Sequence, residues 1–261
     1  MTKRLPRLYV GSNLKMYKTI QQTVAYLKEL QCLTADIPRD KLTLFILPSC
    51  TALAEASRSV NHEQILIGAQ NMHWEEQGQY TGEISPLMLQ EIDVDLVMVG
   101  HAERRQLFFE TDEMVNRRLL ASLIHGFTTL LCIGETANDK HYGISEERLR
   151  TQLKIALNGV EPETLSRLWV AYEPVWSIGD KGTVAEPSYV NKMHEVLRDT
   201  LNRLYGDDSD VTPVLYGGSV NQENAVGLIE QPAVDGLFIG RAAWEAVSFN
   251  AILRQTIKIF F

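Results

Sequence analysis

Cysteine is scarce in this sequence, and the few cysteines form no pattern. The 261 residues contain three, Cys32, Cys50 and Cys132, and no CxxC pair. An odd and sparse set argues against a disulfide framework and against a zinc site built on cysteine pairs. It fits a reducing cytosol, so we expect a cytoplasmic protein.

Long apolar runs are also missing. No stretch is long enough to span a bilayer, and a short strand-like run, not the apolar region of a signal peptide, follows the basic residues 1–7. The net charge of −8 is spread without blocks of like charge, which disfavours a nucleic-acid surface and contact with anionic membranes. We therefore expect neither nucleic acid nor membrane as a partner, and an anionic substrate would need a local positive pocket.

The chain lacks linkers and low-complexity tracts and instead repeats one unit. Short apolar runs, typical of strands buried on both faces, alternate eight times with segments that have helical spacing or helix caps. Eight such units in 261 residues predict a single α/β domain over residues 1–261, folded as a (βα)8 barrel. A doubly wound open sheet is the alternative, but residues 11–15 lack the GxGxxG turn that it would require.

The boundaries of these units follow from apolar runs and cap residues. The expected strands are residues 8–13, 42–47, 65–69, 96–99, 128–133, 168–172, 214–216 and 236–239. The expected helices are 19–30, a segment capped by Ser49 or Thr51 and ending near 57, 112–125 capped by Asp112, 145–157, 187–205, 221–230 capped by Asn221, and 248–259.

Charged residues follow two of these strands, at the end of a barrel where active sites form. Glu173 ends the sixth strand, and Pro174 biases it toward extended backbone. A carboxylate at the mouth of an apolar strand is partly desolvated and so a better base than one in water, although a simple strand cap is the alternative. Lys15, with Asn13 to position it, can supply a countercharge for an anionic substrate and an oxyanion, or it can be an ordinary solvated lysine.

His101 follows the fourth strand and precedes a possible helix start. The N-terminus of a helix disfavours the imidazolium, so we expect a neutral ring that donates a hydrogen bond, with a purely structural histidine as the alternative. Glu103, Arg104 and Arg105 come next. At a strand end we interpret them as a buried ion-pair network that holds Lys15, in preference to a solvated charge run.

Glycine turns follow the seventh and eighth strands. The first is Gly217-Gly218-Ser219, and the second ends in Gly240-Arg241. Glycine lets backbone N–H groups approach an anion, and a following helix N-terminus favours negative charge. Two tight turns without a ligand are the alternative, but barrels commonly bind phosphate after these two strands, which favours a phosphate site.

Together these segments resemble the triosephosphate isomerase family along essentially the whole chain, which implies the (βα)8, or TIM, barrel. The matching segments are Asn13-Leu14-Lys15-Met16, Gly68-Ala69-Gln70-Asn71, residues 80–86, Gly100-His101-Ala102-Glu103-Arg104-Arg105, Cys132-Ile133-Gly134-Glu135-Thr136, residues 171–176, Tyr216-Gly217-Gly218-Ser219-Val220 and residues 235–240.

The resemblance implies an isomerase without cofactor or metal, which moves a carbonyl between adjacent carbons of a phosphorylated sugar through an enediolate. This family is itself a standard worked example of acid–base tuning. By resemblance, Glu173 is the base, His101 is the neutral electrophile, Lys15 and Asn13 stabilise the enediolate, and Glu103 supports Lys15.

The resemblance also implies how substrate and subunits are held. Residues 174–183 would form a closing lid, and Gly179, Ser219 and Gly240 would donate backbone N–H groups to phosphate. The loop 71–82 would be the arm of a homodimer. Its apolar and aromatic residues, Met72, His73, Trp74 and Tyr80, are expected to need a partner to cover them.

Three features depart from the usual family pattern. Ala102 stands where a serine usually steadies the base, so Glu173 is expected to be less well held at rest. The lid continues Asp180-Lys181-Gly182, and Arg241 stands where a second glycine is usual. Arg241 can still donate its backbone N–H, and its side chain can reach phosphate or close the pocket.

These departures, with residues 71–78 and 240–244, resemble a branch of the family that isomerises erythrulose phosphates. The expected substrate is therefore a three-carbon or a four-carbon sugar phosphate, and the sequence leaves both open. A barrel that binds phosphate without catalysing a reaction is the alternative from a different functional class. It is disfavoured because Lys15, His101 and Glu173 are all present. The hypothesis of a metal-dependent hydrolase has less support, because no histidines and aspartates are spaced as metal ligands usually are.

Overall fold

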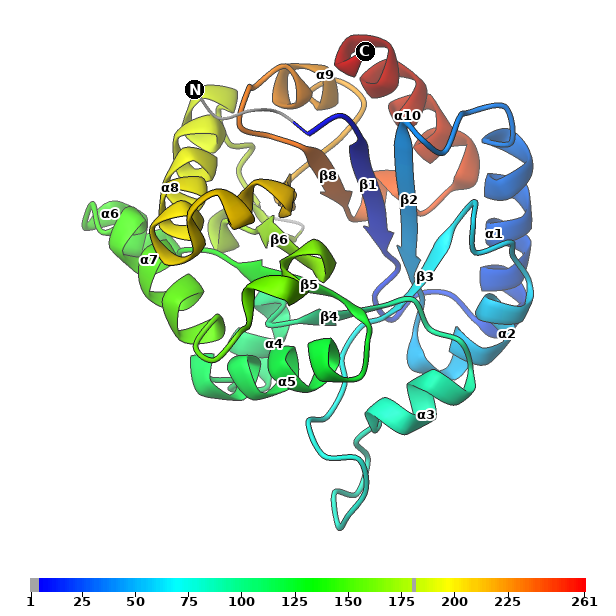
Figure 1. Ribbon diagram of the computed structural model, residues 1–261. Helices are drawn as coiled ribbons and strands as arrows, with labels where there is room; N and C mark the ends of the chain where they lie inside the picture. Colours follow the sequence, from blue (N-terminus) through cyan, green and yellow to red (C-terminus); the bar gives the residue numbers. More distant parts are fainter. Residues whose placement is uncertain (1–4, 180–181) are drawn as a thin grey trace.

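The centre of the molecule is a closed barrel of parallel strands (Figure 1). The computed structural model describes residues 5–179 and 182–261. Each strand pairs with its neighbours in chain order, and β1 also pairs with β8, which closes the ring and confirms the predicted (βα)8 barrel. The strands are β1 (Leu8–Asn13), β2 (Leu42–Leu47), β3 (Leu66–Ala69), β4 (Leu96–Val99), β5 (Thr128–Ile133), β6 (Leu168–Tyr172), β7 (Val214–Tyr216) and β8 (Gly236–Ile239).

Helices surround the barrel on its outside (Figure 1). The α-helices are α1 (Ile20–Leu33), α2 (Leu53–Arg58), α3 (Pro86–Glu91), α4 (Ala102–Leu107), α5 (Asp112–Ile124), α6 (Ala137–His141), α7 (Ser145–Ala156), α8 (Pro187–Tyr205), α9 (Ala225–Ile229) and α10 (Ala246–Phe260). The short 3-10 helices are η1 (Cys50–Ala52), η2 (Pro162–Arg167), η3 (Val175–Ser177), η4 (Gly206–Val211) and η5 (Arg241–Ala243). None of the helices found in residues 5–179 and 182–261 has the length and apolar character needed to cross a membrane.

The strands bury both of their faces, which explains their continuous apolar runs. One cluster fills the interior of the barrel, where the ring of Phe45 lies 5.7 Å from that of Phe238 and 5.3 Å from that of Trp169, measured between centroids. The other, larger cluster joins the outer faces of the strands to the helices. Along β5, Leu130 and Cys132 belong to the interior, while Leu131 and Ile133 face the helices, as the two-residue period of a strand requires.

Three expected helix starts were wrong. The cap of α5 is Thr111, whose hydroxyl accepts from the Met114 N–H at 3.3 Å, so Asp112 is the first helical residue and not the cap. Asn221 forms a turn with residues 223 and 224, and α9 begins only at Ala225. Ser49 makes no capping hydrogen bond, and η1 separates it from α2.

Two short helices, α3 and α6, were not predicted from the sequence. Each has only five or six residues, too few for apolar spacing to repeat. Their cap signals were nevertheless present. Ser85 caps α3 ahead of Pro86, and Thr136 and Asp139 form a capping box at the start of α6.

The loop 71–82 projects from the barrel between β3 and α3, at the bottom of Figure 1. Met72 and His73 were expected to need a partner, but they are only 1% and 6% exposed within the protomer. His73 lies between the rings of Trp74 and Tyr80, each 4.2 Å away between centroids. The base of the loop is thus covered by its own chain, and Tyr80 is the member of this cluster that stays exposed.

The closure of the barrel makes a stability prediction at Gly236 on β8. A Cβ built there would lie 1.8 Å from the carbonyl oxygen of Tyr9 on β1, a backbone atom that cannot move aside without opening the seam. We expect Gly236→Ala to destabilise the fold by about 2–4 kcal/mol. Gly227 in α9 is the control, because its Cβ would meet only Pro187 at 3.7 Å.

Urea denaturation measures both variants. Gly227→Ala is expected to be neutral or to gain about 0.5–1 kcal/mol, since alanine favours the helix. An unchanged unfolding midpoint for Gly236→Ala would show that the β1–β8 seam tolerates a side chain.

Candidate active site

Lys15 lies in a turn that hydrogen bonds from other strands hold in place. Its φ of 51° is left-handed, which is costly for a residue other than glycine. Asn13 Oδ1 accepts from the Lys15 N–H at 2.8 Å, and the Gln70 amide donates to the carbonyls of Lys15 at 2.9 Å and of Leu47 at 3.1 Å. The ammonium contacts Glu103 Oε1 at 2.5 Å. The charge of Lys15 is therefore fixed over the mouth of the barrel.

Trp244 fastens Asn13 from the other side. Its indole N–H donates to the Asn13 carbonyl at 2.9 Å, and its ring packs against Tyr17 at 4.3 Å between centroids. Trp244 follows η5, in the turn after β8. The turn that carries Lys15 is thus tied directly to the turn that carries Gly240.

His101 caps α4, as its place before a possible helix start suggested. Its Nδ1 accepts from the Glu103 backbone N–H at 3.2 Å, so this nitrogen carries a lone pair. The proton of the neutral ring then lies on Nε2, which is 3.4 Å from Glu173 Oε1. The side chain is buried at the amino end of α4. The arrangement presents an N–H donor beside a carboxylate.

Glu173 follows β6 and is only 2% exposed. Its Oε2 accepts from the Ala102 N–H at 3.2 Å, so the amino end of α4 holds the carboxylate although residue 102 has no hydroxyl. Glycines make room for it. A Cβ on Gly217 would lie 2.9 Å from Glu173 Cγ, and one on Gly134 would lie 1.8 Å from its carbonyl oxygen.

Cys132 lies beneath Glu173 in the barrel interior and is fully buried. Burial, and then the negative charge of Glu173, raise the pKa of the Cys132 thiol well above its usual range. Cys132 therefore lines the site as a neutral thiol and not as a thiolate.

A buried carboxylate, Glu135, anchors the chain that follows Glu173. Glu135 Oε1 accepts from Trp176 Nε1 at 2.8 Å, from the Tyr189 hydroxyl at 2.9 Å and from the Tyr172 hydroxyl at 3.0 Å. Burial raises the pKa of Glu135, although these hydrogen bonds oppose the shift. Lys140 Nζ lies 3.3 Å from the centroid of the Trp176 ring. The chain after Glu173 is thus fixed at its amino end, while Asp180 and Lys181 lie outside the described residues.

The two glycine turns stand where the sequence placed them, after β7 and β8. The N–H of Gly217 donates to the Tyr172 carbonyl at 2.8 Å, so this residue contributes space and not a donor to a ligand. The N–H of Ser219 donates to Ser177 Oγ at 3.1 Å. A Cβ on Gly240 would meet no atom within 4 Å, so the turn at Gly240 is open. Arg241 follows it, exposed, beside a hollow of about 230 Å³.

This geometry can be compared with that of known proteins. A family model described as triosephosphate isomerase matches residues 8–256. The chain belongs to the triosephosphate isomerase family. An L-erythrulose-1-phosphate isomerase of Rhizobium etli is 44% identical over 95% of this chain and 92% of its own length. One from Mesorhizobium japonicum is 41% identical, over 94% and 95% respectively.

A triosephosphate isomerase of Caldanaerobacter subterraneus subsp. tengcongensis is 40% identical over 95% of this chain and 98% of its own length. Together with the family match, these relatives identify the chain as an isomerase. The resemblance to the triosephosphate isomerase family, and to its erythrulose-phosphate branch, is confirmed.

The sequence singled out the charged residues that meet here, but it gave no role to the residues that support them. The structure brings Lys15, His101 and Glu173 together at one end of the barrel, with Asn13 and Glu103 beside Lys15. Four supporting residues were given no role from the sequence: Gln70, Glu135, Ser177 and Trp244. Gln70 directly follows β3 and Glu135 comes two residues after β5, a signal that could have found them.

The support of Asn13 by Trp244 can be tested with Trp244→Phe, which keeps an aromatic ring against Tyr17 and removes only the indole donor. Loss of this bond loosens the Asn13–Lys15 turn, and misplacement near reacting groups is costly, so we expect about a tenfold fall in kcat/KM. Steady-state isomerase kinetics measure it. Tyr205→Phe is the control, because its hydroxyl donates to the carbonyls of Leu157 and Val160 away from the site. Wild-type kcat/KM in Trp244→Phe would contradict the support.

Proposed function

We propose that the protein isomerises a short phosphorylated ketose through an enediolate, without a cofactor or metal, and that Glu173 carries the proton. One observation supports this most directly. The carboxylate of Glu173 and Nε2 of His101 lie 3.4 Å apart, and both side chains are buried. Glu103, 3.7 Å from His101 Nδ1, also pairs with Lys15. A silent phosphate-binding barrel would need no such pair.

In the proposed reaction Glu173 takes a proton from the carbon next to the carbonyl. The C–H electron pair becomes the carbon–carbon double bond of an enediolate, and the negative charge moves to the carbonyl oxygen. His101 Nε2–H donates to that oxygen, and Lys15 and Asn13 stabilise its charge, with Glu103 holding Lys15. His101 relays a proton between the two oxygens, and Glu173 returns its proton to the neighbouring carbon, which completes the move of the carbonyl.

The phosphate of the substrate is assigned to the glycine turns. Gly179, Ser219 and Gly240 donate backbone N–H groups to it, and Arg241 adds a positive charge beside Gly240. Gly217 and Gly218 contribute by having no side chain. The φ of Gly179 is 85°, a left-handed value that glycine adopts without strain.

For the substrate we favour L-erythrulose 1-phosphate, converted to D-erythrulose 4-phosphate. The relative at 44% identity is named L-erythrulose-1-phosphate isomerase. Arg241 directly follows Gly240, one of the residues to which we assign the phosphate. Dihydroxyacetone phosphate and glyceraldehyde 3-phosphate are the second candidate pair, supported by the relative at 40% identity. The altered lid residues Asp180 and Lys181 fall outside the described residues, so the preference rests on the relatives and on Arg241.

A substrate panel tests this function. We expect measurable isomerisation of L-erythrulose 1-phosphate and a lower kcat/KM on glyceraldehyde 3-phosphate, because a site that hydrogen-bonds an extra hydroxyl discriminates strongly against a substrate without it. Glu173→Asp is the control. It keeps the charge but retracts it by one methylene, which should cost about a hundredfold on every substrate of this site.

If the enzyme isomerises glyceraldehyde 3-phosphate efficiently but not L-erythrulose 1-phosphate, only the second pair, dihydroxyacetone phosphate and glyceraldehyde 3-phosphate, would remain. Wild-type rates in Glu173→Asp would remove Glu173 as the proton carrier, whichever substrate is used.

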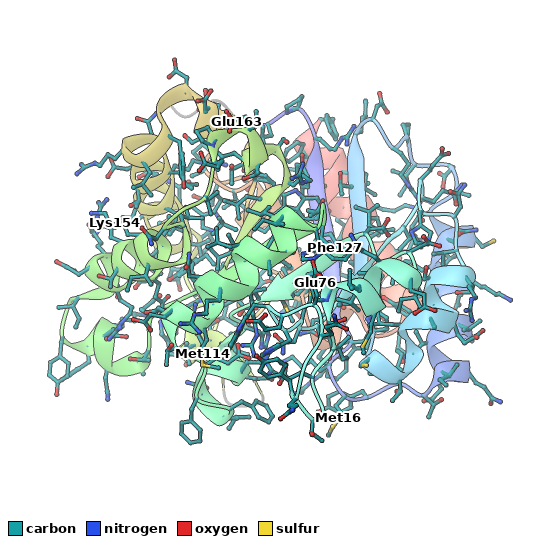
Figure 2. The ribbon with its side chains drawn as sticks, turned by 60° about the horizontal axis from the view of Figure 1, so that its bottom comes forward. Met16, Glu76, Met114, Phe127, Lys154 and Glu163 are labelled. Carbon is teal, nitrogen blue, oxygen red and sulfur yellow. The ribbon has the colours of Figure 1, made fainter. Side chains whose placement is uncertain are left out.

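We also propose a cytoplasmic homodimer, joined through the loop 71–82 and its neighbours. Cys32 and Cys50 are exposed and unpaired, which suits a reducing compartment. Apolar side chains stand uncovered near the projecting loop, with Met16 92% and Phe109 82% exposed, and Figure 2 shows Met16 at the lower edge of the molecule. Such patches mark association surfaces.

Ion pairs connect the segments that carry this patch. Lys15, next to Met16, pairs with Glu103 of α4, and α4 leads into Phe109. Arg118 pairs with Glu110, directly after Phe109, and lies 3.9 Å from Glu83 at the base of the projecting loop. The three segments are therefore linked to one another, and we propose that their exposed apolar side chains contact a second copy.

The interface is tested with Phe109→Ser, which should weaken self-association by about tenfold or more, because buried aromatic anchors dominate interfaces. Sedimentation equilibrium measures the dissociation constant. The control is Tyr142→Ser, a residue 73% exposed after α6, which lies away from the projecting loop in Figure 1. A strictly monomeric and fully active wild type would remove the proposal.

A further inference from the structure

The backbone N–H of Ser219 already has an acceptor inside the protein. It donates to Ser177 Oγ at 3.1 Å. Ser177 is the last residue of η3, is only 1% exposed, and is held there by its own N–H, which donates to the Pro174 carbonyl at 2.8 Å. The backbone of η3 therefore holds the Ser177 hydroxyl against the turn that follows β7.

The surroundings are shaped to allow this contact. The Tyr216 hydroxyl lies 3.3 Å from Ser177 Oγ. A Cβ on Gly218 would lie 2.2 Å from that hydroxyl and 3.0 Å from Ser177 Oγ, so glycine lets both side chains reach the turn. Burial raises the pKa of Tyr216 to about 12, so its hydroxyl keeps its proton at neutral pH and stays available to Ser177.

A single N–H cannot donate at full strength to two acceptors. Ser219 is one of the three residues whose N–H we assign to phosphate, so a role for this contact in substrate binding rests on the proposed function. We propose that Ser177 is a positioning residue whose hydroxyl oxygen occupies the place of a phosphate oxygen on the Ser219 N–H. A phosphate monoester must displace this oxygen in order to bind.

The exchange has two effects. Without substrate, Ser177 keeps a buried donor satisfied and its direction fixed. With substrate, the bond to Ser177 is lost, which lowers the affinity for phosphate. The phosphate contact is remote from the reacting carbons and is made equally in the ground state and the transition state, so the competition acts on KM more than on kcat.

The experiment uses the full chain and inorganic phosphate as the probe. We expect Ser177→Ala to lower the inhibition constant of phosphate by about three- to tenfold, the range that one net hydrogen bond supplies, and to lower KM by a similar factor. The control is Ser209→Ala, which removes the hydroxyl of another buried serine, one that donates to the Gly206 carbonyl at 2.7 Å in η4. It should leave both constants unchanged.

Amide hydrogen exchange at Ser219 supplies a second measurement that does not depend on a variant. In the wild type this amide should be protected without phosphate, through Ser177, and again with it. In Ser177→Ala it should be protected only with phosphate. An unprotected Ser219 amide in the phosphate-free wild type would show that the bond to Ser177 is not made, and the inference would fall.

The outcomes separate this inference from the function on which it rests. If phosphate inhibits the wild type and Ser177→Ala equally, the competition is absent and the phosphate site stands. If phosphate neither inhibits the wild type nor protects the Ser219 amide of Ser177→Ala, the assignment of phosphate to this turn is itself wrong, and the inference falls with it.

Discussion

Burying the carboxylate of Glu173 is the constraint on which the carboxyl end of this barrel depends. An ion removed from water needs hydrogen-bond donors and space, and its neighbours supply both. The N–H of Ala102 at the start of α4 donates to it, Gly217 leaves room for the side chain, and Gly134 leaves room for the backbone carbonyl of Glu173. Each partner belongs to a different strand unit. The carboxylate can therefore be accommodated only when the barrel closes and brings these strand ends together.

The strand order was predictable because one local rule governs all eight strands. Each is buried on both faces, so each reads as a short apolar run bounded by polar or glycine residues. The carboxyl ends of parallel strands meet at one edge, which is why Lys15, His101 and Glu173 could be grouped from the sequence. Their grouping needed no more than topology.

The partners of the supporting residues could not be predicted, because a place after a strand does not show which atom a side chain reaches. Gln70 and Trp244 reach the turn at Lys15 from the ends of β3 and β8, across long stretches of sequence. A glutamine or a tryptophan that makes such a bond has the same local pattern as one that does not. The cap of α5 was ambiguous for a related reason, because two neighbouring residues can each serve as a helix cap. Thr111 and Asp112 are both good caps, and only the backbone conformation decides that Thr111 is used.

The position of Ala102 shows how a backbone can perform a task expected of a side chain. Its missing hydroxyl suggested a poorly held Glu173, yet the N–H of the same residue reaches the carboxylate. Since every residue other than proline offers that N–H, the position can vary in side chain while the carboxylate stays bound. The carboxylate of Glu173 is thus held by a main-chain contact that a change of side chain at residue 102 need not remove.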